Sequence, residues 1–139
     1  MLFILMLEDD HDRIARFNAI LDQHDGETQI VIRRTAPGFI EAHGQLKSIP
    51  TLIALDHDLF TDHADDPDPG DGRDVAVHLA ACEPICPVLI HSTNKPAAES
   101  MLLTLRDAKW TADRIAPIGD DWIESYWYPV ALEMIARNA

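Results

Sequence analysis

Short apolar runs alternate with segments of helical periodicity along almost the whole chain. Leu2–Leu7 shows no polar alternation, which is expected of a strand that is covered on both faces. The segment 9–23 then places Ile14, Phe17 and Leu21 at helical spacing. Because this succession of strand and helix recurs, it predicts a parallel sheet with helices on both faces.

The rest of the chain repeats this unit. Further strands are expected at 28–33, 51–55 and 87–90, with a weak one at 114–118, and helices at 37–46, 74–81, 97–110 and the end of the chain, where Pro129 should start or kink the last helix. The predicted fold is α/β, a flavodoxin-like or receiver-like (βα)5 three-layer sandwich with a parallel five-stranded sheet in the order 2-1-3-4-5. We expect one domain over residues 1–139.

The charge balance narrows the range of partners. The chain has 24 acidic and 11 basic residues and a formal net charge of -13, which repels a nucleic-acid backbone and makes long nucleic acid an unsuitable partner. No apolar run approaches the about 20 residues that a membrane-spanning helix needs. Residues 1–7 are apolar but lead straight into three acids and lack the basic start of a signal peptide. We therefore expect a cytoplasmic protein without a membrane partner.

Polar clusters follow three of the predicted strands. They are Glu8-Asp9-Asp10, Asp56-His57-Asp58 and His91-Ser92-Thr93-Asn94. In open parallel sheets, ligands bind outside the carboxyl ends of the strands, so these clusters predict a functional site at that edge. Carboxylates gathered there repel one another unless some are protonated, some point to water, or a cation neutralises them.

The acids of these clusters are candidate ligands of a hard divalent cation, Mg²⁺ or Mn²⁺. The predicted metal ligands are Asp9, Asp10, Asp56 and Asp58. In an extended segment, alternate side chains share a side, so Asp56 and Asp58 should point together and His57 away. The same parity separates His91 from Ser92, and the sequence leaves open which of the two faces the acids.

Histidines and cysteines divide into candidates and bystanders. His57 and His91 stand at strand ends and are candidates for proton transfer or metal binding. The other histidines are expected on the surface or on helix faces: His11, His24, His43, His63 and His78. Cys82 and Cys86 cannot by themselves close a tetrahedral zinc site and are expected to be reduced structural thiols. The acidic loop 62–71 has two prolines and no glutamate at the spacing of an EF-hand, so we interpret it as an acidic lid or a solvated loop.

In these motifs the chain resembles the receiver domains of two-component response regulators. The resemblance rests on the acidic residues after the first strand, on Asp56 after Ile53-Ala54-Leu55, on Gly72 and on Ser92. It implies that Asp9, Asp10 and Asp56 bind magnesium and that Asp56 accepts a phosphoryl group. Receivers carry a lysine before a proline at the end of strand five, whereas this chain has Ala116 before Pro117. Of the three lysines only Lys95, just past strand four, is at that edge of the predicted sheet, and it is the candidate substitute for the missing lysine.

A more specific resemblance is to the cyclic-phosphate processing receiver domains. It is carried by Leu7-Glu8-Asp9-Asp10 with Arg13 and Phe17, Leu55-Asp56-His57-Asp58-Leu59, Asp71-Gly72 and His91-Ser92-Thr93-Asn94. The resemblance implies action on cyclic or other phosphate esters of nucleotides. The expected ligand is accordingly a small phosphorylated or cyclic nucleotide.

Three functions follow from these residues. The first is a metal-dependent phosphoesterase in which the acids hold the cation, His57 is a base or ligand, His91 protonates the leaving oxygen and Asn94 orients a phosphate oxygen. Asp56 would be part of this catalytic set, with Glu8, Arg13, Ser92 and Lys95 in supporting positions. Arg13 lies one helical turn from the acids and is expected either to pair with one of them or to remain solvated.

The two other functions need no turnover. In one, Asp56 is the phosphoacceptor of a signalling receiver, and the absent strand-five lysine weighs against this. In the other, the chain is a non-catalytic binding module for a partner protein or for a second copy of itself. That module would use Trp122, Tyr126, Trp127 and Tyr128 near the last helix, a group that equally fits a plain hydrophobic core.

Overall fold

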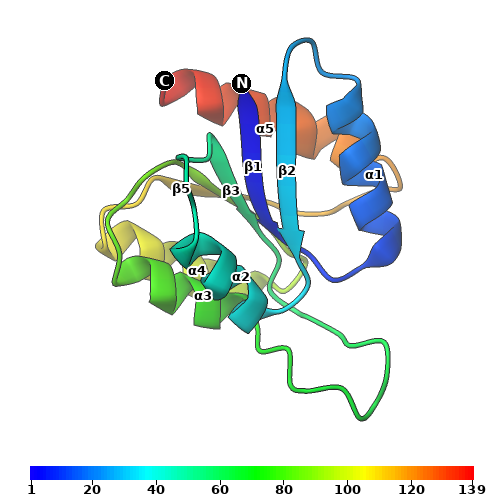
Figure 1. Ribbon diagram of the computed structural model, residues 1–139, viewed down its shortest axis with the longest axis vertical. Coiled ribbons are helices and arrows are strands. Elements are labelled where there is room, and N and C mark those ends of the chain that lie inside the picture. Colours follow the sequence, from blue (N-terminus) through cyan, green and yellow to red (C-terminus); the bar gives the residue numbers. More distant parts are fainter.

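The computed structural model describes residues 1–139 and contains a five-stranded parallel sheet (Figure 1). Its strands are β1 (Leu2–Leu7), β2 (Thr28–Arg33), β3 (Leu52–Leu55), β4 (Val88–His91) and β5 (Ala112–Ile115). They lie in the order β2-β1-β3-β4-β5, and each neighbouring pair is parallel. The predicted strand order and flavodoxin-like receiver fold are confirmed.

Helices cover both faces of the sheet. They are α1 (His11–Asp22), α2 (Ala36–Gly44), α3 (Gly72–Ala80), α4 (Lys95–Asp107) and α5 (Tyr128–Arg137), the last of which follows a π-helical turn, η1 (Ile123–Trp127). Side chains of α1, η1 and α5 pack on one face of the sheet, and side chains of α2, α3 and α4 pack on the other. None of these helices combines the length and apolar character needed to cross a membrane.

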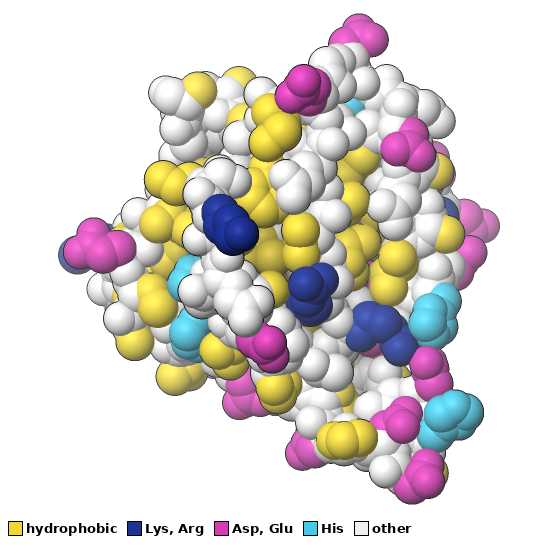
Figure 2. Space-filling model, viewed as in Figure 1, with side chains coloured by type: hydrophobic (Ala, Val, Ile, Leu, Met, Phe, Trp, Pro, Cys, Tyr) yellow, Lys and Arg dark blue, Asp and Glu magenta, His cyan; other side chains and the backbone are white.

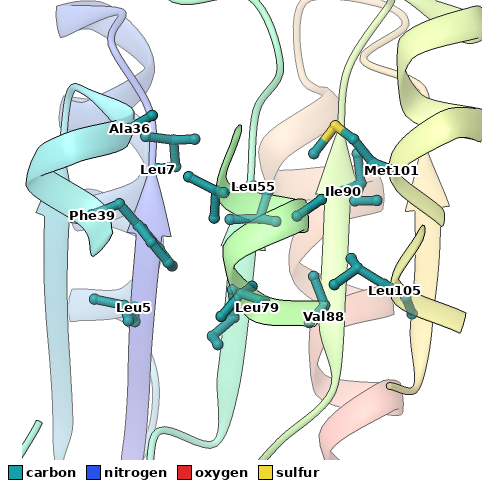
Figure 3. Close-up of a cluster of buried hydrophobic side chains, with 14 of the residues drawn as sticks. Leu5, Leu7, Ala36, Phe39, Leu55, Leu79, Val88, Ile90, Met101 and Leu105 are labelled. Carbon is teal, nitrogen blue, oxygen red and sulfur yellow. The ribbon is translucent and has the colours of Figure 1, made fainter. Parts of the chain in front are cut away.

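Alternate residues of the strands supply the two cores. On the side of α2, α3 and α4, Leu5 and Leu7 of β1 pack in one cluster with Leu55 and Ile90 (Figure 3). On the side of α1 and α5, Met6 packs in a cluster with Phe17 and Trp127. Both faces of the central strands are buried, which is why their sequences show no polar alternation.

The ends of several elements differ from the prediction by a few residues. β5 occupies Ala112–Ile115 instead of 114–118, because its register with β4 starts at Val88↔Ala112 and Pro117 has no N–H to continue the ladder. α3 begins at Gly72 instead of Asp74, because Asp71 and Asp74 form a capping box that starts the helix. Pro129 stands in the first turn of α5, where the sequence led us to expect it.

The aromatic residues near the last helix are mostly core. Trp122 and Trp127 are buried against Phe17, and Tyr128 bonds through its hydroxyl to His24 Nδ1 at 2.7 Å. Tyr126 is the exposed member of the group. The structure therefore does not supply the aromatic dimer surface of the binding-module hypothesis, because these indoles complete the cluster beneath β1 and β3.

Gly72 positions α3 against the end of β3. A Cβ at this residue would overlap the carbonyl oxygen of Asp56 and lie 2.8 Å from His57 Cα. Gly72 N also donates to His57 O at 2.9 Å. The absence of a side chain thus lets the helix start directly behind the residues that follow β3.

Candidate functional site

A pocket of about 200 Å³ opens at the carboxyl edge of the sheet. It is lined by Asp9, Asp10, Arg13, Asp56, Asp58, Phe60, Ser92 and Thr93. These residues come from the ends of β1, β3 and β4 and from the first turn of α1. The structure therefore brings together the four predicted metal ligands, with a guanidinium and two hydroxyls beside them.

Backbone hydrogen bonds hold two of the carboxylates in place. Asp9 Oδ2 accepts the N–H of Phe60 at 2.8 Å, and Asp56 Oδ1 accepts the N–H of His57 at 2.7 Å. The second oxygen of each carboxylate remains for a ligand in the pocket. Asp10 Oδ1 accepts the N–H of Arg13 at 2.9 Å and so caps α1, which makes this residue both a helix cap and part of the lining.

Glu8 is the residue whose position the sequence prediction underrated. It lies fully buried under the pocket, where its Oε2 accepts the N–H groups of Asp9 at 2.9 Å and Asp10 at 3.1 Å. Its Oε1 is 3.1 Å from Nε2 of the equally buried His91. Ligand atoms of Glu8, Asp56 and His91 all lie within 4.8 Å of one another. Glu8 is thus the centre of the polar cluster, where the sequence suggested only a supporting role.

Strand register explains this convergence. Leu7 pairs with Leu55, and Leu55 pairs with Ile90. All three point into the cluster beneath α2, α3 and α4, so the residues that follow them turn to the opposite side of the sheet. Those residues are Glu8, Asp56 and His91. The sequence carried this signal, but it could be read only with the register of the three strands in hand.

Burial and crowding shift the pKa values of the three buried acids. Burial, reinforced by the charge of Glu8, raises the pKa of Asp56 to about 8. Burial also raises the pKa of Asp9. Burial alone would raise the pKa of Glu8 as well, but the hydrogen bond and charge of His91 and the bonds from the backbone hold it below its usual range. The site therefore retains the Glu8 carboxylate and disfavours ionisation of its neighbours.

Arg13 supplies the cation of the cluster. Its Nη1 lies 3.8 Å from Glu8 Oε1 and 3.8 Å from Asp56 Oδ2. Its guanidinium carbon stands 5.2 Å from the centre of the Trp122 ring, at cation–π distance. Of the two expectations for Arg13, pairing and solvation, the structure bears out pairing. A cation from α1 thus stands beside Asp56 although Ala116 replaces the strand-five lysine of receivers.

The structure shows which of His91 and Ser92, at the end of β4, faces the acidic pocket. The His91 ring has no exposed surface and lies between Phe17 and Trp122, with ring centroids 5.4 Å and 5.7 Å away. Ser92 lines the pocket. The Ser92 hydroxyl therefore faces the acids in the pocket, whereas the His91 imidazole bonds to Glu8 in the protein interior. This position does not allow His91 to protonate a leaving group directly, because the ring does not reach the pocket.

His57 points away from the pocket, as strand parity predicted. Its Nδ1 is 2.7 Å from Asp58 Oδ1, and its Nε2 is 3.7 Å from Asp71 Oδ2. The ring thus bonds to the acid in the pocket and stands near Asp71, the N-cap of α3, without a hydrogen bond to it. His57 itself is not in the lining, so it touches a ligand only through Asp58.

Asn94 and Lys95 serve mainly α4. Asn94 Oδ1 accepts the N–H of Ala97 at 3.2 Å and caps the helix, while its Nδ2 is 3.4 Å from Asp58 Oδ1. The Lys95 side chain is 72% exposed, and its Nζ is 3.9 Å from Glu99. Neither residue lines the pocket. Lys95 therefore does not take the place of the strand-five lysine, because its side chain runs along the surface of α4.

The acidic loop between β3 and α3 projects from the same edge of the molecule (Figure 1), and Figure 2 shows acidic side chains on this projecting part of the surface. Asp62 anchors it through Arg34, with Nη1–Oδ2 at 2.9 Å, and through His11 Nε2 at 3.0 Å. The exposed Phe60 lies between the acidic pocket and a neighbouring one of about 320 Å³ that Arg34 and Asp62 line. The loop is thus solvated but fixed beside the site at Phe60 and Asp62, and near its end by the bond from Ala36 N to Pro69 O.

The sheet order and the acidic cluster at the carboxyl edge define a receiver-like domain. The family model of the cyclic-phosphate processing receiver domain matches residues 3–107, and the chain belongs to this family. The match includes every residue that lines the acidic pocket. A search among curated proteins finds no match.

Solved structures with similar folds are receiver domains at low sequence identity. A CheY-like receiver domain from Methanospirillum hungatei JF-1 is 15% identical with a TM-score of 0.67, covering 99% of both chains. A two-component response regulator from Clostridium difficile is 15% identical with a TM-score of 0.65, covering 96% of this chain and 97% of that one. The Mn²⁺-bound form of the response regulator Rcp1 is 18% identical with a TM-score of 0.66, covering 91% of this chain and 94% of that one. These similarities establish the fold.

Proposed function

We propose that this chain is a metal-dependent phosphoesterase that acts on cyclic or other phosphate esters of nucleotides. The observation that carries the proposal is the lining of one small pocket, in which four carboxylates stand beside the Arg13 guanidinium and the hydroxyls of Ser92 and Thr93. Acids alone would repel a phosphate, whereas acids that hold a cation next to an arginine form a site for one. The family description, cyclic-phosphate processing, agrees with this substrate class. The proposal treats residues 1–139 as one domain.

The donor set suits Mg²⁺ or Mn²⁺. All of the ligands would be carboxylate oxygens, from Asp9, Asp10, Asp56 and Asp58, and hard cations prefer such oxygens. Burial, reinforced by the charge of Glu8, raises the pKa values of Asp9 and Asp56 in spite of the nearby Arg13. A bound cation would supply the missing charge, polarise the phosphate ester and lower the pKa of a coordinated water.

The remaining residues would bind the substrate and move protons. Arg13 would hold a phosphate oxygen, because its guanidinium faces the pocket and its position is fixed by Trp122 and Glu8. Asp58, besides binding the cation, would accept the proton of the attacking water, and its Oδ1 is held 2.7 Å from His57 Nδ1. The leaving oxygen would take up its proton from solvent. The proton roles proposed for His57 and His91 therefore become positioning roles, in which His57 orients Asp58 and His91 orients Glu8.

The test is turnover of 3′,5′-cyclic nucleotides and of nucleoside 2′,3′-cyclic phosphates with Mg²⁺ or Mn²⁺, followed by chromatography of the products. We expect the rate of hydrolysis to fall at least 100-fold in Asp56→Asn, which loses a carboxylate that binds the cation. The same fall is expected in Arg13→Gln, which loses the guanidinium that binds the phosphate. Asp65→Asn, on the exposed loop, is the matched control and should keep full activity. No turnover of any substrate by the intact protein, or equal rates in all variants, would refute the enzyme proposal.

A second candidate is a phosphoacceptor receiver. It is favoured by one observation, the Oδ2 of Asp56, which accepts no backbone hydrogen bond and lies 3.8 Å from Arg13 in a pocket that also contains the Ser92 hydroxyl. Arg13 would then neutralise the phosphoaspartate. Incubation with acetyl phosphate and Mg²⁺, followed by intact mass measurement, distinguishes the two functions. A stable adduct of one phosphoryl group that Asp56→Asn abolishes supports signalling, and turnover without an adduct supports the enzyme.

A further inference from the structure

Three soft ligands that the sequence treated as bystanders meet on the side of the molecule formed by α2 and α3. His43 lies in the last turn of α2, His78 in the last turn of α3, and Cys82 just after α3. Figure 2 shows histidine side chains at the surface over these helices. His43 also lines a pocket with residues that precede β3 and β4, namely Ser48, Ile49 and Ile85. The cluster therefore lies at the amino edge of the sheet, opposite the acidic site.

The spacing of the ligand atoms is close to that of a metal site. His43 Nδ1 is 3.1 Å from His78 Nε2, which is 4.0 Å from Cys82 Sγ, and all three atoms lie within 4.8 Å of one another. Zinc bonds of about 2.05 Å to nitrogen and about 2.3 Å to sulfur at tetrahedral angles place two nitrogens about 3.3 Å apart and nitrogen and sulfur about 3.6 Å apart. The first two distances differ from these values by a few tenths of an ångström, and side-chain rotation would have to shorten the third, between His43 Nδ1 and Cys82 Sγ, which is at most 4.8 Å.

The surroundings favour a cation over protonated imidazoles. The facing nitrogens of His43 and His78 lie 3.1 Å apart, at hydrogen-bond distance, so at least one of them is an acceptor with a free lone pair. His43 and His78 stand in the last turns of α2 and α3, and helix C-termini carry partial negative charge, which favours a cation there. The three residues are partly exposed, so an ion can reach them.

We propose that His43, His78 and Cys82 bind a divalent transition metal of the zinc type, with a fourth position open to water. Imidazole and thiolate are ligands that select zinc or cobalt over magnesium. On binding, the Cys82 thiol releases its proton to solvent and becomes the thiolate ligand. All three ligands are partly exposed, which leaves room for water at that fourth position. This site is independent of the proposed phosphoesterase function, because it shares no residue with the acidic pocket.

The test is a Co²⁺ titration of the reduced protein in the Asp56→Asn background, which weakens the acidic site. We expect one equivalent of Co²⁺ to produce a thiolate-to-metal charge-transfer band in the near ultraviolet and tetrahedral d–d bands in the visible range. Cys82→Ser should abolish the charge-transfer band, and His43→Gln or His78→Gln should weaken Co²⁺ binding at least 10-fold. Cys86→Ser, which removes a thiol whose pKa burial raises to about 12, should leave the spectrum unchanged.

The outcomes are decisive in either direction. A charge-transfer band that is absent from the parent, or that survives in Cys82→Ser, would overturn the proposal. So would equal binding in His43→Gln and in the parent, which would reduce the pair to an ordinary hydrogen bond between histidines. Circular dichroism and thermal melts of each variant without metal establish that it is folded. Zn²⁺ should then raise the melting temperature of the parent and of Cys86→Ser, but not that of Cys82→Ser.

Discussion

The two ends of α3 meet two very different polar clusters. At its amino end, Gly72 packs against the backbone of Asp56, whose carboxylate lies in a buried set with Glu8 and Arg13. At its carboxyl end, His78 faces His43 in a partly exposed group that contains no carboxylate. The buried charged set depends on internal hydrogen bonds and on a cation, whereas water can reach the partly exposed histidine and cysteine side chains. We therefore expect the acidic cluster at the amino end of α3 to destabilise the metal-free protein. The cluster at the carboxyl end should have little effect on the stability of the metal-free protein.

The largest expected effect comes from breaking the centre of the buried set. Glu8→Ala should lower the free energy of unfolding by about 3–5 kcal/mol, because it leaves His91 and the N–H groups of Asp9 and Asp10 without their acceptor. His43→Ala, in the other cluster, should cost no more than about 1 kcal/mol without metal, since its partner remains partly exposed. Urea denaturation at pH 7 measures both. Similar losses in the two variants would contradict the contrast drawn between the clusters.

The next effect concerns the contact that holds α3 against the acidic site. Gly72→Ala should destabilise the protein by about 2–4 kcal/mol, because the new Cβ would overlap the Asp56 carbonyl oxygen and the backbone there cannot move freely. Gly44→Ala is the matched control, since a Cβ at Gly44 meets nothing within 4 Å, and it should change stability by less than about 1 kcal/mol. Thermal melts of both variants, together with Mg²⁺ titrations, check the prediction. A harmless Gly72→Ala would refute the proposed packing.

A smaller effect should appear in the pH dependence of stability. Because the pKa of Asp56 is raised from 3.8 to about 8 in the folded protein, the unfolded chain releases this proton first as pH rises. The protonated Asp56 side chain therefore contributes to the stability of the fold below about pH 4. The protein loses this contribution as pH rises from about 4 to 8. Glu8, with its lowered pKa, acts in the opposite direction, but in a more acidic range.

Asp56→Asn should remove this dependence and keep the hydrogen bond from His57 N, because asparagine retains an acceptor oxygen. In the presence of EDTA at pH 8.5, we expect the free energy of unfolding of the variant to be higher than that of the parent by on the order of 1–3 kcal/mol. At pH 5 the two free energies should be closer. Mg²⁺ should narrow the difference by stabilising the parent alone. Unfolding curves recorded from pH 5 to pH 9 give the answer, and parallel profiles would mean that Asp56 is not perturbed.

The smallest effect is expected at Lys95. Because its side chain is 72% exposed and faces Glu99 instead of the pocket, Lys95→Ala should change stability by less than about 0.5 kcal/mol and leave phosphate-ester turnover unchanged. Arg13→Lys should weaken turnover at least 10-fold, since an ammonium cannot reproduce a planar guanidinium held over Trp122. Paired kinetic assays compare the two. A substantial loss in Lys95→Ala would restore this lysine as the substitute for the strand-five residue.

The sequence determined the fold and the edge of the sheet on which the acidic site lies. Buried strands and amphipathic helices leave periodic patterns along the chain, so their order and the parallel sheet could be predicted. Helix and strand ends were less predictable, because hydrogen bonds decide them locally, as the Asp71–Asp74 capping box does for α3. The acids after β1 and β3 could be placed at one edge because parallel strands share their direction.

Only the tertiary structure decided which side chains touch. Glu8 meets His91 because β1, β3 and β4 stand in one particular register, and a shift of one residue would have brought Ser92 to that side instead. His43 meets His78 because α2 packs beside α3, a contact that no periodicity records. Periodicity reports which face of an element is buried, but the partner of each buried side chain depends on packing between elements that are distant in sequence. For this reason the acidic site was predictable in place but not in detail, and the cluster at the other end of α3 was not predictable at all.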